Sequence, residues 1–110
     1  MSYALSLALL FLAAVLEASG DALMRQGMYS PTTARRFLFV LAGCVVLATY
    51  GYTVNAPRWD FGRLLGVYVA FFFLLAQLIA YFTFGQRPST SVVVGGLLIV
   101  SGGLIVSLGK

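Results

Sequence analysis

Apolar side chains occupy four long stretches of this chain, and short polar segments separate them. The stretches cover residues 3–24, 37–54, 64–84 and 89–108. Each holds about 18–22 residues, which is about 27–33 Å of helix and matches a hydrocarbon core of about 30 Å. None alternates between apolar and polar positions as a barrel strand does, so helices remain as the way to span lipid. The pattern predicts an all-α membrane protein with four transmembrane helices in a single domain, residues 1–110.

The segments between the stretches carry residues that favour turns. The turn-forming residues are Gly27, Ser30 and Pro31 in the first link, Asn55, Pro57 and Gly62 in the second, and Gly85 and Pro88 in the third. Gly85 suits the end of a helix, and Pro88 suits the first turn of the next one. Tyr29 and Trp59 also lie in links, where we expect their rings to sit at the membrane interface.

The composition excludes the ordinary soluble classes of protein. Of the 110 residues, 61% are hydrophobic and 9% are charged, whereas soluble domains hold about 25% charged residues. The one cysteine, Cys44, cannot form a disulfide within the chain, and its apolar neighbours predict a small buried residue. The sequence has no histidine, which excludes zinc sites built on His or clustered Cys, and no pattern predicts a cofactor. The net charge of +4 comes from scattered arginines and indicates membrane flanks, with no nucleic acid as a partner.

The basic residues are divided almost evenly between the two membrane surfaces. With four spans, both termini share one side with the second link, and the first and third links share the other side. The two groups are Arg25, Arg35, Arg36 and Arg87 on the side of the first and third links, and Arg58, Arg63 and Lys110 on the terminal side. The positive-inside bias is therefore close to zero. Two interpretations stand about equal: a few residues set one orientation weakly, or copies insert both ways up.

Glu17 is an acidic residue deep within an apolar stretch, about two-thirds of the way along the first one. An ionised carboxylate at that depth costs roughly a few kcal/mol on insertion scales, so such a group is by default a functional candidate. Burial favours the neutral form, and a carboxyl of this kind can hold a proton or, once ionised, a cation. The alternative is a structural glutamate that forms a hydrogen bond within the bundle or extends to the membrane edge. Glu17 and Asp21 also argue against a signal peptide.

Asp21 follows Glu17 by one helical turn on the same face. It lies near the end of the stretch with Arg25 four residues on, so we favour an Asp21–Arg25 ion pair at the interface over a second carrier acid. The remaining residues of this face are small or slender, and they are Leu10, Ala13, Ala14, Gly20 and Met24. Small residues let another helix approach or leave a cavity beside the carboxyl. The candidate binding site therefore includes Ala13 and Gly20 with Glu17 and Asp21.

The fourth stretch carries two pairs of glycines, each spaced by seven residues or two helical turns. The pairs are Gly95 with Gly102 and Gly96 with Gly103. A glycine stripe lets helix backbones pack closely, and four helices of this length do not easily enclose a pathway alone. The pattern predicts a homodimer, an eight-helix bundle with the fourth helix as the contact, and packing within one protomer is the alternative.

Together these residues resemble the small multidrug resistance family, within the drug/metabolite transporter superfamily, over nearly the whole chain. The matching motifs are Glu17-Ala18-Ser19-Gly20 with Leu23-Met24-Arg25, the turn Phe84-Gly85-Gln86-Arg87, and the spaced glycines Gly95 and Gly102. The resemblance implies that Glu17 is the carboxylate for protons and substrate, one from each protomer of an antiparallel dimer. It also implies export of cationic amphiphiles or guanidinium-type cations in exchange for protons.

The third stretch departs from the pattern of that family. Counting back from Gly85 places Tyr68 at the family's tryptophan, which keeps an aromatic wall. The positions of the family's kink glycines hold Ala70, Phe71 and Phe72. Asp21 falls where the multidrug members usually have threonine. Gly62-Arg63 followed by Tyr68 also resembles uncharacterised four-helix relatives of the family.

The first functional hypothesis is a proton-coupled exporter of small or amphiphilic organic cations in the inner membrane of a bacterial cell. Protons and the cation would compete for Glu17, and Tyr68 and Tyr50 would offer aromatic faces to the cation. Its partners would be the lipid bilayer and a second copy of the chain. The alternative is a non-transporting membrane subunit that presents the run Phe71 to Phe73 to lipid or to a larger assembly. An intramembrane enzyme has little support, because no nucleophile–base pair occurs at helical spacing.

Overall fold

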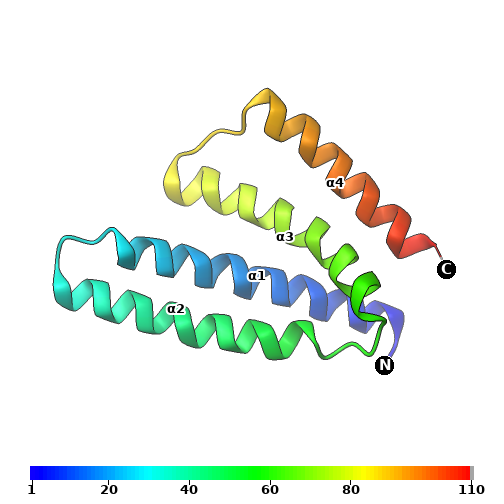
Figure 1. Cartoon of the computed structure of the whole chain (residues 1–110), viewed down its shortest axis with the longest axis horizontal. Coiled ribbons are helices and arrows are strands. Elements are labelled where there is room, and N and C mark those ends of the chain that lie inside the picture. Colours follow the sequence, from blue (N-terminus) through cyan, green and yellow to red (C-terminus); the bar gives the residue numbers. More distant parts are fainter. Residues whose placement is uncertain (110) are drawn as a thin grey trace.

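The computed structural model describes residues 1–109 and folds them into four α-helices (Figure 1). The helices are α1 (Tyr3–Met28), α2 (Thr33–Val54), α3 (Phe61–Phe84) and α4 (Thr90–Leu108). Each is long and apolar enough to cross a bilayer. Its backbone groups, except those at the ends, are paired within the helix, as the interior of a bilayer requires. The predicted all-α class, with four helices long and apolar enough to span a membrane, is confirmed for this part of the chain.

Several helix boundaries lie about one turn beyond the apolar stretches. α1 continues to Met28 and α3 begins at Phe61. Gly27 and Gly62 therefore lie inside helices, whereas the sequence analysis placed them in links. Apolar character alone does not set these ends, because arginine is a good helix former and the headgroup region accepts its charge.

The third link has one predicted end and one that differs. Gly85 ends α3 with a positive φ of 65°, as predicted. Pro88 was expected in the first turn of the next helix, but it precedes that helix. Ser89 is the N-cap of α4, and its hydroxyl accepts a hydrogen bond from the Val92 amide at 3.3 Å.

The helices lie side by side in the order α2, α1, α3, α4 (Figure 1). α1 packs against both α2 and α3, whereas α4 packs mainly against α3. The two termini and the link of residues 55–60 lie at one end, and the links of residues 29–32 and 85–89 lie at the other, as four spans require. The protomer is flat, with extents of 50 × 35 × 18 Å. Lys110, one of the basic residues in the charge comparison, lies outside the described residues.

Glycines bring α1 and α2 into direct backbone contact. A Cβ atom on Gly43 of α2 would lie 3.0 Å from the Gly20 carbonyl oxygen and 3.1 Å from the Met24 nitrogen. A Cβ atom on Gly20 would lie 2.8 Å from the Leu47 side chain. Gly20 therefore faces α2, and its function is close helix packing.

The buried core lies mainly between α1 and α3. Its members are Leu10, Ala13 and Ala14 from α1, Val54 from α2, and Leu64, Val67 and Tyr68 from α3. Most large apolar side chains outside it are exposed on the surface of the protomer, which suits contact with lipid. Cys44 is also exposed, so the prediction that it is buried is wrong. The reason is that α2 turns the adjacent Gly43 toward α1.

Aromatic and arginine side chains join three helices at the terminal end of the protomer. The Trp59 ring stacks on Tyr3 with centroids 5.6 Å apart, and the Arg63 guanidinium lies 5.6 Å from the Trp59 centroid. Arg63 also donates a hydrogen bond of 3.1 Å to the Ser107 carbonyl, and the Tyr3 and Ser107 hydroxyls are hydrogen bonded. Trp59 therefore lies in a link as predicted, and it holds α1 and α3 together.

Candidate functional site

Glu17 on α1 forms a hydrogen bond with Tyr68 on α3. The Tyr68 hydroxyl lies 2.7 Å from Oε1 of Glu17 and donates to it. The same hydroxyl lies 3.5 Å from the Ala13 carbonyl, one turn earlier on α1. Tyr68 is only 4% exposed, and a buried tyrosine hydroxyl needs a hydrogen-bond partner. Glu17 provides that partner through Oε1.

Small side chains on α1 make room for this contact. Ala13 and Ala14 are fully buried and belong to the same core cluster as Leu64, Val67 and Tyr68 of α3. The Tyr68 hydroxyl lies 3.5 Å from the Ala13 carbonyl, so Ala13 lies beside the Glu17–Tyr68 contact.

An aromatic wall surrounds the Tyr68 ring. Tyr50 of α2 lies 5.7 Å from it between centroids, at an interplanar angle of 34°. Phe72 of α3 lies 6.1 Å from it on an almost parallel plane, at 25°. Aromatic faces attract organic cations through their negative quadrupole. Two helices, α2 and α3, therefore contribute aromatic groups beside the Glu17 carboxyl of α1.

Phe72 was not among the predicted site residues. The resemblance placed it over a kink glycine of the family, and the alternative hypothesis placed it on a surface for lipid or a larger assembly, whereas its ring stacks on Tyr68 inside the protomer. Its spacing from Tyr68 is the signal that was available, because residues four apart share one face of a helix. The face of α3 that carries the predicted aromatic group thus carries a second one.

Asp21 and Gly20 are not part of the Glu17–Tyr68 contact. Gly20 packs against Leu47 of α2. Asp21 is exposed on α1, and within residues 1–109 no ion pair joins it to Arg25. The Arg25 guanidinium instead lies over two aromatic rings, 5.7 Å from the centroid of Tyr29 and 5.6 Å from that of Phe84. The expected Asp21–Arg25 pair is therefore wrong for this conformation, because cation–π contacts hold the arginine.

The structure divides the predicted glycine stripe of α4 into two faces. A Cβ atom on Gly103 would lie 2.6 Å from the Ala70 Cβ atom, and one on Gly96 would overlap the Phe73 ring. Gly96 and Gly103 therefore pack against α3 inside the protomer, which corrects their assignment to a dimer contact. The space beside Gly95 and Gly102 is open, with no atom within 4 Å of an added Cβ atom.

The site offers a carboxyl group and aromatic faces. Among residues 1–109, no three His, Cys, Asp or Glu side chains come together in a way that could hold a metal ion. A carboxyl held by one tyrosine hydroxyl can accept a proton on its second oxygen or bind a cation there. Both events use the same atoms and exclude each other.

Comparison with known proteins finds one clear similarity. The chain is 35% identical over 98 residues to a UPF0060 membrane protein of Kineococcus radiotolerans, which covers 88% of this chain and 86% of that protein. No family model matches the chain. No solved structure matches it either.

Proposed function

We propose that this chain, which belongs to the UPF0060 membrane protein family, exports small or amphiphilic organic cations in exchange for protons. The observation that carries the proposal is the 2.7 Å hydrogen bond between Tyr68 and Glu17 beside the rings of Tyr50 and Phe72. An acidic residue within a spanning helix is costly and marks ion or proton pathways. The resemblance of the Glu17 segment to the small multidrug resistance family supports the same function.

Proton coupling follows from competition for one carboxyl. An ionised Glu17 binds the cation, and the adjacent aromatic faces add attraction of about 0.5–2 kcal/mol. A proton that reaches Glu17 removes the charge and releases the cation. The site opens to the two membrane surfaces in turn while Glu17 holds either a proton or the cation. Export of the cation is thereby coupled to entry of a proton.

We also propose that the working unit is a homodimer in the inner membrane of a bacterial cell. The flat protomer, 18 Å in its shortest dimension, leaves its broad faces uncovered. The open glycines Gly95 and Gly102 permit close approach of a second α4. The nearly even division of basic residues favours an antiparallel pair.

Transport by purified protein in liposomes tests the proposal. The liposomes are loaded with tetraphenylphosphonium, and a proton gradient directed into them is imposed. We expect protons to enter the liposomes and tetraphenylphosphonium to leave them. Glu17→Gln keeps the size of the side chain and removes its charge, so both fluxes are expected to fall to the level of protein-free liposomes. Asp60→Asn is the matched control, because Asp60 is an exposed acid in the link before α3, and it should transport normally.

The outcome also separates the proposal from the alternative of a non-transporting subunit. Tetraphenylphosphonium flux that survives Glu17→Gln would refute the mechanism. A native protein that folds in liposomes but moves no organic cation, with or without the gradient, would favour the subunit.

A further inference from the structure

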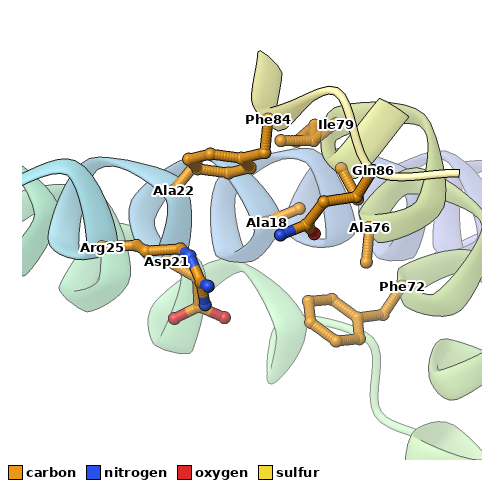
Figure 2. Close-up of a pocket in the computed structure, with 10 residues that line it drawn as sticks. Ala18, Asp21, Ala22, Arg25, Phe72, Ala76, Ile79, Phe84 and Gln86 are labelled. Carbon is orange, nitrogen blue, oxygen red and sulfur yellow. The ribbon is translucent and has the colours of Figure 1, made fainter. Parts of the chain in front are cut away.

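A cleft opens between α1 and α3 at the end that carries the links of residues 29–32 and 85–89 (Figure 2). Its volume is about 240 Å³. α1 contributes Asp21 and Arg25, α3 contributes Phe72 and Phe84, and the link contributes Gln86. Small alanines of both helices complete the walls. The cleft is large enough for a small organic molecule, and it contains an acid that the proposed function does not use.

Asp21 is open to a ligand because its arginine neighbour is held elsewhere. Figure 2 shows both side chains leaving the same region of α1 toward the cleft. The Arg25 guanidinium lies over the rings of Tyr29 and Phe84, and no ion pair joins Arg25 to Asp21 among residues 1–109. An acid without an ion pair at the edge of an apolar cleft attracts a positively charged group.

The cleft adjoins the Glu17–Tyr68 contact. Phe72 lines the cleft and also stacks on the Tyr68 ring, so one aromatic side chain belongs to both. Glu17 and Asp21 are four residues apart on α1, which places them on the same side of the helix and about 6 Å apart along its axis. Glu17 does not itself line the cleft, and Asp21 lies one helical turn nearer the link of residues 29–32.

We propose that Asp21 and Glu17 together bind a short organic dication, a diamine with its ammonium groups about 6 Å apart. One ammonium group pairs with Glu17 and the other with Asp21, while the methylene chain lies against Phe72 and the alanines. This inference rests on the proposed cation site at Glu17. It adds a preference for substrates with two charges, because a monocation leaves Asp21 without a partner.

Competition binding with two matched amines tests the inference. The full chain in lipid nanodiscs is loaded with tetraphenylphosphonium, which is then displaced by 1,4-diaminobutane or by 1-aminobutane at one pH. For the native protein we expect the diamine to be the stronger competitor by about two- to fivefold, since an exposed second ion pair contributes at most about that factor. Asp21→Asn should reduce the ratio to about one without weakening 1-aminobutane. Asp60→Asn should leave the ratio unchanged.

Further variants keep the test decisive if Asp21→Asn folds poorly. Asp21→Glu retains the charge and should retain the preference for the diamine. Arg25→Gln removes a competing positive charge from the cleft and should increase that preference. Equal competition by the two amines in the native protein, or a preference that persists in Asp21→Asn, would overturn the inference. Tetraphenylphosphonium binding that survives Glu17→Gln would instead overturn the proposed function, so the two failures are distinguishable.

Discussion

The Tyr68 hydroxyl reaches across from α3 and donates a 2.7 Å hydrogen bond to Oε1 of Glu17 on α1. A hydrogen bond from a hydroxyl to a carboxylate is charge-assisted and fixes the geometry of the pair. The tyrosine therefore positions the carboxyl that we propose binds the cation. Its ring could be supplied by any aromatic residue, but this hydrogen bond comes from the hydroxyl alone.

Tyr68→Phe separates the two contributions, since it retains the ring and removes the donor. A hydrogen bond to a charged group contributes about 1.5–3 kcal/mol, and about 1.4 kcal/mol corresponds to a tenfold change in a dissociation constant. Without the donor the position of the Glu17 carboxyl is no longer fixed, so the affinity for tetraphenylphosphonium should fall by about tenfold. A binding titration at one pH measures it.

The control for that substitution is Tyr52→Phe. Tyr52 is 87% exposed on α2, and the same chemical change there should leave the affinity for tetraphenylphosphonium at its native value. An unchanged affinity in Tyr68→Phe would show that the hydroxyl does not act on the carboxyl that binds the cation.

Gly43→Ala should destabilise the pair α1–α2. The added methyl group would meet backbone atoms of Gly20 and Met24 at 3.0 and 3.1 Å, and backbone yields less than a flexible side chain. We expect a loss of about 1–3 kcal/mol in the free energy of unfolding, as for other overpacked positions. Gly51→Ala, on the same helix with open space around it, should be neutral or stabilising by about 0.5–1 kcal/mol. Unfolding by denaturing detergent compares the two, and equal stabilities would contradict the packing of α1 on α2.

The four spans could be predicted from the sequence because apolar length alone decides whether a helix crosses lipid. The sequence also indicated Glu17, whose charge is unusual at that depth. It indicated Tyr68 and Tyr50 as aromatic partners, and the structure brings all three together. Each of these residues supplies chemistry that is rare inside a membrane, and its function in binding stays a prediction.

The remaining differences concern which helix a residue faces. Gly20 was grouped with Glu17 by spacing, yet it contacts Leu47 of α2, and Gly96 contacts Phe73 of α3. A glycine in a membrane helix indicates that another backbone comes close, but it does not identify that backbone. The expected Asp21–Arg25 pair was wrong for a similar reason, because Phe84 belongs to another helix and its ring attracts the arginine.

Gly102→Val and Gly103→Val should affect different levels of assembly. Gly102 has open space around it, so valine there should leave the protomer stable and weaken a dimer formed through α4. Gly103 packs on Ala70, and valine there should reduce the stability of the protomer itself. Cross-linking reports the dimer, and thermal unfolding in detergent reports the protomer. Unchanged cross-linking in Gly102→Val would place the dimer contact on another surface.

The last prediction concerns orientation in the membrane. The side of the first and third links carries Arg25, Arg35, Arg36 and Arg87, and the terminal side carries Arg58, Arg63 and Lys110. Because positive charge stays on the cytoplasmic side, this near balance predicts that native copies insert both ways up. Arg58 and Arg87 are both exposed in links, so removing either charge should tip the balance without disturbing the packing. Arg58→Gln should increase the share of copies with the termini outside, and Arg87→Gln should increase the share with the termini inside. Reporter fusions to the C-terminus, one active inside the cell and one active outside, measure these shares. A native chain that lies wholly one way up, and that neither substitution shifts, would exclude the antiparallel dimer.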